Sequence, residues 1–386
     1  MKLRNSTHPE RLSVLVTSAM HAGERRLLGE DAFQHMISLE RKRTERSRKP
    51  FLLILLDFAP AFPLESGPKS LASIVSALGL MTRETDVTGW YRDQATLGIM
   101  FIELGTEGPD TVVEKILHRV SAILHNYLSA EEVIRVGVTY HLFPEEWDHD
   151  LPKRPSSPEL YPDLSRRDDS RKFFRAMKRA MDVAGSLLAL MLFAPFFLLI
   201  ALAVKITSPG PVFFRQRRVG QYGKSFVFLK FRSMYINNDP SLHQNYVRDL
   251  IAGRAERKPS NGTGHGDGVY KLTKDPRITP VGEFIRKTSL DELPQFLNVL
   301  RGEMSLVGPR PAIPYEVEAY DIWHRRRILE AKPGITGLWQ VNGRSRVKFD
   351  EMVRLDLRYA QTWSPWLDLK ILLRTPGAVF TGDGAW

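Results

Sequence analysis

The sequence predicts an α+β protein with two domains, of which the second is mainly helical and associates with a membrane. The chain has 386 residues, a length that suits two domains of ordinary size or three small ones. Helix-length and strand-length apolar patterns alternate through its first third, and a proline-rich stretch is followed by a long uncharged one. We therefore predict a first domain over residues 20–145, a linker over 146–170 and a second domain over 171–386.

The first domain follows a regular order of elements. Apolar spacing predicts a helix over 23–49, strands over 51–56, 86–92, 95–103 and 133–143, and helices over 69–80 and 111–128. After the leading helix this order is β-α-β-β-α-β, which is typical of the ferredoxin-like fold. The first strand and the hairpin resemble those of GGDEF-type nucleotide cyclases, but the hairpin carries Gly89-Trp90-Tyr91-Arg92-Asp93 in place of the family signature. The resemblance implies a degenerate GGDEF-like domain with a regulatory or dimerising role and no cyclase activity.

Composition restricts the remaining possibilities. Residues 144–170 hold five prolines and dense mixed charge, which predicts a linker that buries little apolar surface. The chain has no cysteine, which excludes disulfides and thiolate metal sites. Its net charge of +11 is concentrated after residue 170, which favours an anionic partner: phospholipid head groups, a nucleotide or nucleic acid.

A membrane helix is predicted over Val183–Val204, a stretch of 22 residues without a charge. As a helix it would be about 33 Å long, enough to cross a bilayer, although a buried core helix is the alternative. Pro195 in its middle must kink it, and Lys and Arg residues flank both ends, which marks the cytoplasmic side. We therefore expect a re-entrant, monotopic anchor with both domains on the cytoplasmic face. The first residues, MKLRNSTHPERLS, lack a signal-peptide core and agree with this location.

The stretch 285–311 carries the strongest indication of chemistry. It places the adjacent acids Asp291 and Glu292 between Arg286 and Arg310, the latter held between two prolines. A carboxylate can attack phosphorus, a second one can hold Mg²⁺, and arginines can offset phosphoryl charge. The alternative is structural: the S-x-x-E pattern that begins at Ser289 fits a helix capping box. The two interpretations are compatible, because helix N-termini also attract phosphate.

Four further segments allow more than one interpretation. Residues 213–234 predict a strand pair, and residues 240–268 an insertion that could be mistaken for a phosphate loop. The segment 333–344, with its tryptophan, faces either the nucleotide or the core. Residues 359–373 form either an interfacial helix with Trp363 and Trp366 or ordinary core packing.

The order of motifs in the second domain is specific. KRAMDV, the apolar stretch, SPGPVFFRQ, KFRSM, SLDELPQ, NVL, GEMSLVGPRP, KPGITGLWQVNGR and WSPWLDLKIL follow one another over residues 172–386. In this order they resemble the bacterial sugar transferase family, the monotopic phosphoglycosyl transferases. The resemblance implies transfer of a sugar-1-phosphate from a UDP-sugar to undecaprenyl phosphate with release of UMP. That reaction starts exopolysaccharide, capsule, O-antigen or glycoprotein glycan synthesis at the bacterial inner membrane.

The resemblance also implies roles for particular residues. Asp291 matches the nucleophile that becomes loaded with the phosphosugar, and Glu292 matches the second acid, which would share Mg²⁺ with it or assist proton transfer. The substrate-binding residues would be Arg286, Arg310, Lys230 and Arg232. One departure concerns the kink, where Ala194-Pro195 replaces the common Ser-Pro pair. Alanine has no hydroxyl for the carbonyl that proline frees.

Other functions remain as alternatives. A non-catalytic membrane scaffold or a nucleotide-sensing signalling protein is the second hypothesis, and the intact acid pair argues against it. Nucleic-acid binding would use the basic half, but an apolar stretch of 22 residues lies within that half. We expect phospholipids as partners, a homodimer as an option and no nucleic acid.

Overall fold

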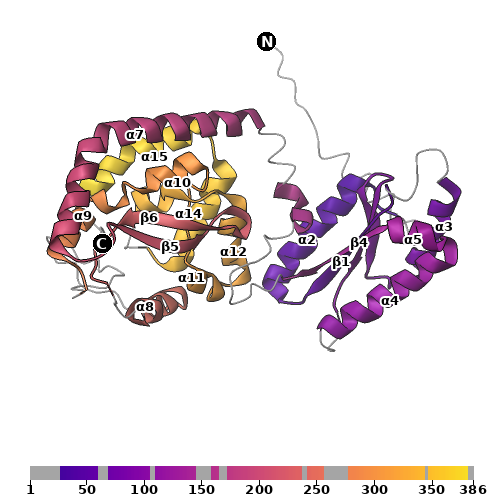
Figure 1. Cartoon of the computed structure of the whole chain (residues 1–386). Coiled ribbons are helices and arrows are strands. Elements are labelled where there is room, and N and C mark those ends of the chain that lie inside the picture. The colour runs from indigo at the N-terminus through magenta and orange to yellow at the C-terminus, as the bar shows by residue number, and fades with distance from the viewer. Residues whose placement is uncertain are drawn as a thin grey trace, which may run out of the picture. The chain divides into compact units, whose positions relative to one another are not determined.

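The computed structural model describes residues 27–59, 68–104, 109–144, 158–164, 172–236, 241–255, 277–343 and 347–380. The chain divides into two compact units, residues 1–145 with 158–163 and the remainder, and Figure 1 draws both. The start of the predicted first helix, Arg171 and the glycines of the predicted insertion lie outside the described residues.

The first unit contains a four-stranded antiparallel sheet in the order β2-β3-β1-β4. Its elements are α2 (Glu30–Ser47), β1 (Phe51–Asp57), α3 (Pro68–Met81), β2 (Val87–Arg92), β3 (Thr96–Phe101), α4 (Pro109–Tyr127), α5 (Ala130–Arg135), β4 (Gly137–Phe143) and the 3₁₀ turn η2 (Pro158–Leu160). This is the strand order of the ferredoxin-like fold, so the predicted topology is confirmed.

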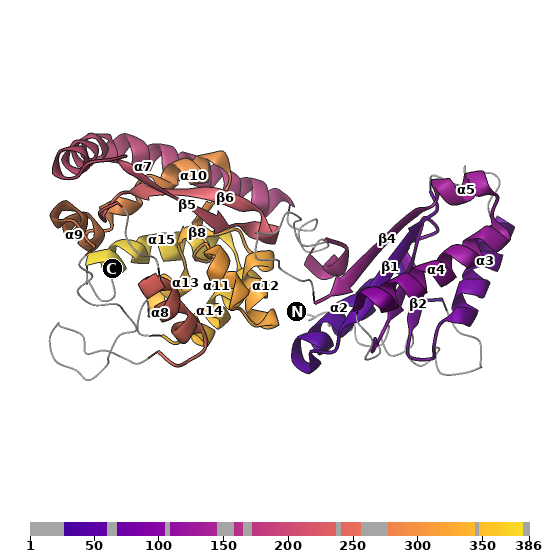
Figure 2. The same ribbon diagram turned by 60° about the horizontal axis from the view of Figure 1, so that its bottom comes forward.

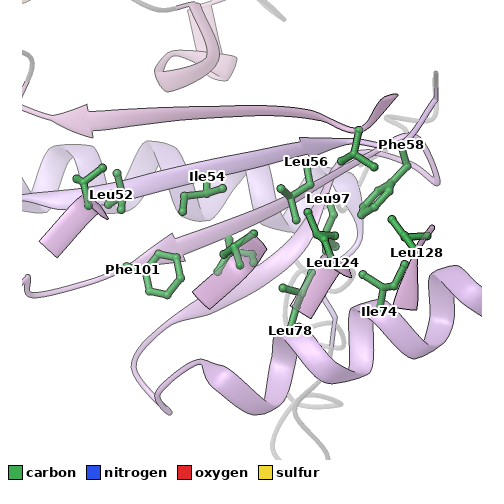
Figure 3. Packing of buried hydrophobic residues seen from close by; sticks show 14 residues of the cluster. Leu52, Ile54, Leu56, Phe58, Ile74, Leu78, Leu97, Phe101, Leu124 and Leu128 are labelled. Carbon is green, nitrogen blue, oxygen red and sulfur yellow. The ribbon is translucent and has the colours of Figure 1, made fainter. Parts of the chain in front are cut away.

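The core of this unit lies between the sheet and two helices. Leu52, Ile54 and Leu56 of β1 point toward Leu78 of α3 and Leu124 of α4 (Figure 3). Six consecutive residues of β1 are buried because α2 covers the opposite face of the sheet. An all-apolar strand such as FLLILL is the pattern expected of a strand covered on both faces.

The leading helix is seated on the hairpin through a pair of glycines. Gly89 and Gly98 face each other across β2 and β3, and the fully buried ring of Phe33 lies against both. A Cβ atom at either glycine would collide with that ring. The Gln34 side chain also donates to the Tyr91 carbonyl oxygen at 2.7 Å, so α2 is fixed to the strand that carries the altered signature.

The last predicted strand begins later than expected. Residues 130–135 form α5 instead, because the Ser129 hydroxyl accepts a hydrogen bond from the Glu132 N–H while the Glu132 carboxylate accepts one from the Ser129 N–H at 2.8 Å. This is a complete capping box, which fixes a helix start at this point.

Part of the predicted linker packs against the first unit. Leu160 is fully buried and Tyr161 nearly so. Arg41 donates to both carboxylate oxygens of Asp163, at 3.0 and 2.9 Å, and its guanidinium lies 4.4 Å from the centroid of the Tyr161 ring. The expectation that this segment buries little apolar surface is therefore wrong for residues 160–161, since composition alone does not show a short apolar anchor held by a buried arginine.

The second unit is mainly helical, as predicted. Its elements are α7 (Lys172–Thr207), β5 (Phe213–Val219), η3 (Gln221–Gly223), β6 (Ser225–Phe231), α8 (Ser241–Ile251), α9 (Pro280–Lys287), η4 (Leu290–Glu292), α10 (Gln295–Arg301), β7 (Ser305–Val307), α11 (Pro314–Glu318), α12 (Ile322–Glu330), β8 (Gly334–Thr336), α13 (Leu338–Asn342), α14 (Phe349–Thr362) and α15 (Pro365–Phe380). The β5–β6 hairpin confirms the predicted strand pair. Helix α8 corrects the interpretation of residues 241–251 as part of an unstructured insertion. The α10 helix lies between α7 and the hairpin in both Figure 1 and Figure 2.

Helix α7 combines an exposed apolar middle with anchored ends. Among the described residues it is the one helix long and apolar enough to cross a membrane, and only 11% of its most apolar window is buried. That exposure contradicts the core-helix alternative. Pro195 lies inside the helix, where its ring removes the hydrogen bond to the Met191 carbonyl, and Figure 1 shows that α7 changes direction along its length.

Polar side chains fasten the first part of α7 to the unit. Lys178 forms an ion pair with Asp368 at 2.6 Å, and Arg179 donates to two carbonyl oxygens at the end of α10. The buried Asp182 carboxylate accepts the Ser305 hydroxyl at 2.9 Å. These contacts hold the helix where it leaves the globular part.

Apolar contacts fasten its second part. Ile200 and Val204 are buried against Phe231 of β6, Ile285 of α9 and Leu293. From Lys178 to Val204, the outermost residues of the two attachments, α7 runs for 26 residues, about 39 Å along a straight helix. Both ends of the apolar middle are therefore held by the same folded body.

Candidate active site

The acid pair lies on a short turn between two helices. Asp291 and Glu292 form η4 with Leu290, after α9 and before α10. Ser289 adopts a left-handed conformation with φ of 56°, and within the described residues its hydroxyl caps no turn. The capping-box interpretation is therefore wrong, and α10 begins instead directly after Pro294. The proline fits there because its fixed φ suits the start of a helix.

Apolar neighbours hold this turn against the membrane helix. Ile285, Leu290 and Leu293 belong to the cluster that packs on the second part of α7. With these side chains fixed, the Asp291 carboxyl is buried and that of Glu292 is exposed. The acid pair thus sits at the attachment of the apolar helix.

Cations surround the buried acid. Burial raises the pKa of Asp291, while Lys230 and Arg286 act against that rise. Burial also lowers the pKa of Lys230, which Asp291 and Glu292 oppose. Each partner is desolvated and each stabilises the charge of the other. Four of the predicted site residues therefore come together in the structure.

The position of Lys230 is set by the β5–β6 hairpin. Lys230 pairs across the hairpin with Phe214, and its ammonium lies 5.3 Å from the centroid of that ring. The fully buried Asn298 of α10 holds the strand, since its Oδ1 accepts the Leu229 N–H at 3.1 Å and its Nδ2 donates to the Val227 carbonyl oxygen at 2.7 Å. Because α10 directly follows the acid pair, Asn298 ties Lys230 to Asp291. A single asparagine within an apolar stretch gave no sequence pattern from which to predict this role.

The loop of Arg310 is pinned at three consecutive residues. Arg327 donates to the Arg310 carbonyl oxygen at 3.2 Å, Arg218 donates to that of Pro311 at 2.8 Å, and the Val219 N–H donates to that of Ala312 at 2.9 Å. The Arg310 side chain itself is exposed. The loop is therefore rigid while its cation faces solvent.

Two buried arginines of this region escaped sequence analysis. Arg327 forms an ion pair with Asp356 at 2.7 Å. Arg218 lies in electrostatic range of Arg310, and burial together with Arg310 lowers the pKa of Arg218 to about 10. Both residues come from runs of consecutive arginines, where spacing does not distinguish a buried member from an exposed one.

Arg232 does not join the site. Its buried guanidinium donates to the carbonyl oxygens of Ser208 and Pro209 at 2.8 and 2.7 Å and to the Ser208 hydroxyl at 2.8 Å. Ser208 and Pro209 directly follow α7, and Arg232 also donates to the Val204 carbonyl oxygen in its last turn at 3.4 Å. Arg232 therefore braces the turn that follows the membrane helix, while its buried Nε has no hydrogen-bond partner among the described residues. Phosphate binding by Arg232 stays a prediction.

The structure places the tryptophans of segments 333–344 and 359–373 in different environments. Trp339 is buried and faces the core, which favours the packing interpretation. In the later segment Trp363 packs inside and donates to Asp368 at 3.1 Å, whereas Trp366 is exposed on α15. An interfacial position therefore fits Trp366 alone.

The carboxylates of Asp291 and Glu292 suit a Mg²⁺ ion that takes its other ligands from the substrate and from water. Among the described residues no group of three acidic or histidine side chains could enclose a metal ion. Mg²⁺, however, commonly uses one or two carboxylates and completes its shell with water and substrate phosphates. Asp291 and Glu292 would hold such an ion, which would offset negative charge on the phosphates.

Comparison with known proteins points to one family for the second unit. The family described as bacterial sugar transferase matches residues 173–382. The chain is 46% identical over 215 residues to the undecaprenyl-phosphate galactose phosphotransferase of Salmonella typhimurium, covering 55% of this chain and 42% of that protein. It is 42% identical over 212 residues to the exopolysaccharide production protein ExoY of Rhizobium meliloti, covering 54% and 88%. It is also 43% identical over 221 residues to the UDP-glucose:undecaprenyl-phosphate glucose-1-phosphate transferase of Caulobacter vibrioides, covering 54% and 72%. The chain thus spans less than half of the Salmonella protein.

Among solved structures, the chain is similar to a DGC protein from Thermotoga maritima. The identity is 19%, the match covers 31% of this chain and 85% of that one, and the TM-score is 0.26.

Proposed function

Because the chain belongs to the bacterial sugar transferase family, we propose that it moves a sugar-1-phosphate from a UDP-sugar to undecaprenyl phosphate and releases UMP. The observation that carries the proposal is the buried Asp291 carboxylate, which lies among cations where the apolar helix joins the folded body. The named relatives act on galactose and glucose substrates, so the sugar has to be found by experiment.

The proposed reaction has two displacements at one phosphorus atom. In the first, an Asp291 carboxylate oxygen attacks the phosphorus next to the sugar, the bond to the bridging oxygen breaks, and UMP leaves. In the second, a phosphate oxygen of undecaprenyl phosphate attacks that phosphorus and the Asp291 carboxylate leaves. The product is the lipid diphosphate sugar, and ping-pong kinetics follow from the covalent intermediate.

The residues around Asp291 support these steps electrostatically. Burial raises the pKa of Asp291, and Lys230 and Arg286 oppose that rise and so favour the ionised, nucleophilic carboxylate. The same cations reduce the repulsion between a carboxylate and an anionic phosphate. Arg310, on its pinned loop, would contact the nucleotide phosphate. Glu292, which is exposed, would hold Mg²⁺ with the substrate or assist proton transfer.

The anchor is proposed to be re-entrant in the cytoplasmic leaflet of the inner membrane. Both ends of the exposed apolar stretch of α7 attach to one body, and Pro195 bends the helix between them. A straight spanning helix would separate these ends by the thickness of the bilayer. Exposed Leu188, Met191 and Leu198 would contact phospholipid tails. Cysteine labelling that places residues 172–179 and 205–218 on opposite membrane faces would refute this topology.

The reaction is tested by UMP release from a panel of UDP-sugars with undecaprenyl phosphate and Mg²⁺. Asp291→Asn is expected to lower turnover on the order of 10³-fold or more, because the nucleophile is lost. Glu292→Gln is expected to raise the Mg²⁺ concentration needed for half-maximal rate. Glu283→Gln, an exposed acid on the adjacent helix, serves as the control and should leave both quantities unchanged. Turnover retained in Asp291→Asn would remove the proposed nucleophile.

The first unit is proposed to regulate the enzyme or to bring two chains together. Its hairpin face is filled by Phe33, which supports a role other than nucleotide turnover. Titration calorimetry of the full chain with guanine and uridine nucleotides, together with its mass in solution, tests this. No heat beyond that of the second unit's substrate, combined with a monomeric mass, would leave this unit with a structural role.

A further inference from the structure

A second polar cluster lies beside Arg310, away from the acid pair. His243 of α8 and Tyr315 of α11 are joined by a hydrogen bond of 2.7 Å between Nδ1 and the hydroxyl, with their rings edge to face at 6.3 Å. Both side chains are half-buried and so keep some open surface. The mechanism above gives neither of them a task.

The packing of α8 against α11 places this pair close to the Arg310 loop. His243, Val247 and Ile251 recur at four-residue spacing on one face of α8, and the last two are buried against Val317 and Tyr320. The packed face of the helix therefore carries His243 toward α11. His243 lies in electrostatic range of Arg310 as well as of Glu316, Arg218 and Arg277.

In one tautomer of His243 the Tyr315 hydroxyl is the donor of their hydrogen bond. Burial and Arg310 lower the pKa of His243 to about 4, so the imidazole is neutral at pH 7. Burial and Glu316 raise the pKa of Tyr315 to about 12, so the phenol keeps its proton and can donate it to Nδ1. A neutral imidazole that accepts at Nδ1 carries its hydrogen on Nε2. The pair therefore offers a fixed, uncharged donor next to cations.

The β5–β6 hairpin runs from the acid pair to the Arg310 loop, and so it sets the order in which a substrate would meet them. Lys230 and Phe214 form one cross-strand pair near Asp291, and Arg218 and Phe226 form another beside the Arg310 loop. Four residues of strand separate these pairs, which is about 13 Å. A donor whose reacting phosphate lies at Asp291 would extend toward Arg310 with its nucleoside end.

We propose that His243 and Tyr315 form the subsite for the uracil and ribose of the nucleotide donor, next to Arg310 as the phosphate-binding cation. The cluster already has guanidinium groups for phosphate charge, whereas an uncharged N–H donor with an aromatic neighbour suits the neutral carbonyl and hydroxyl oxygens of a nucleoside. This inference rests on the proposed function, since it names the part of the UDP-sugar that these residues contact.

The test uses the full chain in lipid nanodiscs and measures the Kd of UMP, the Kd of inorganic pyrophosphate and the KM of the UDP-sugar. His243→Ala is expected to weaken UMP and to raise the donor KM about tenfold, the effect of one lost hydrogen bond. The Kd of pyrophosphate and the KM of undecaprenyl phosphate should stay within twofold. Tyr246→Phe, which removes a hydroxyl from the same helix, is the matched control and should change none of these.

Two conservative variants test the same subsite if His243→Ala folds poorly. A glutamine amide reaches the position of Nε2, whereas an asparagine amide reaches only that of Nδ1. His243→Gln should therefore retain UMP binding within about threefold, and His243→Asn should lose it as alanine does. Equal UMP affinity in all variants, or equal loss of UMP and pyrophosphate, would overturn the subsite. A native chain that binds UMP in this way but turns over no UDP-sugar would instead overturn the proposed function.

Discussion

Asn298 offers the most direct test of how the fold builds the site. Its side chain is fully buried and joins α10 to β6 through the Leu229 N–H and the Val227 carbonyl, and it also donates to Glu303 at 2.6 Å. In Asn298→Ala the buried Leu229 N–H and the part-buried Val227 carbonyl oxygen each lose their side-chain partner. At about 1–3 kcal/mol each, the free energy of unfolding should fall by about 2–6 kcal/mol. In a unit of this size that lowers the melting temperature by roughly 4–20 °C.

The assay is thermal unfolding of the detergent-solubilised chain, followed by UMP release below the transition. Asn245→Ala makes the same change at an exposed position of α8 and is expected to alter the free energy of unfolding by less than about 0.5 kcal/mol. Turnover of Asn298→Ala should also fall at temperatures where the variant is folded, because β6 carries Lys230 to Asp291. If both variants melt at the same temperature and release UMP at the native rate, the asparagine does not hold the site together.

Three further predictions concern single side chains. Burial raises the pKa of Asp291 and Lys230 opposes that rise, so Lys230→Met should move the acid limb of single-turnover UMP release to higher pH. Exposed Lys224→Met is the control, and an unmoved limb would separate Lys230 from Asp291. The folded-state pKa of His243, about 4, lies below its usual 6.5, so the unfolded chain takes up the proton first and stability is lost as pH falls between those values. His243→Gln should flatten that part of a plot of melting temperature against pH, and an unchanged slope would contradict the burial of a neutral imidazole. Arg232→Met removes the donors to the buried Ser208 carbonyl and the part-buried Pro209 carbonyl, which directly follow α7, and should cost on the order of 3 kcal/mol in thermal unfolding. Exposed Arg217→Met should cost little, and equal costs would show that the turn after α7 does not depend on Arg232.

The S-x-x-E patterns that begin at Ser129 and at Ser289 have different outcomes, and only the first is a capping box. At Ser129 the following residues continue as a helix, so the box closes and α5 forms. At Ser289 the chain must bury Leu290 and Leu293 beneath α7 and begin a new helix after Pro294, so the serine turns left-handed and the pattern is not used. Local pattern predicts a helix start only where tertiary packing leaves the turn free to form.

Several elements of both units could be predicted because each depends on apolar periodicity within its own segment. The strand over 51–57, the hairpin after α7 and the apolar stretch around Pro195 all appear where the sequence placed them. The acid pair was found because two carboxylates and flanking arginines form a local motif.

The contacts that hold the site in place could not be predicted in the same way. Asn298, Arg218 and Arg327 each bond to backbone atoms of segments far away in the sequence. Their partners are carbonyl and N–H groups, which every residue carries, so no residue type marks the other end of the contact. The contacts of Arg232 with Ser208 and Pro209 escaped prediction for the same reason, since its motif does not show which carbonyl oxygens lie beside it.

The central claim is that Asp291 becomes covalently loaded with a sugar phosphate before the lipid accepts it. Intact and peptide mass spectrometry of the chain incubated with a UDP-sugar and Mg²⁺, without undecaprenyl phosphate, tests it directly. The account predicts one added sugar phosphate on the peptide containing Asp291, an equal amount of UMP released, loss of the adduct when undecaprenyl phosphate is added, and no adduct in Asp291→Asn. Steady turnover with no adduct under rapid quenching, or an adduct on another residue, would contradict it.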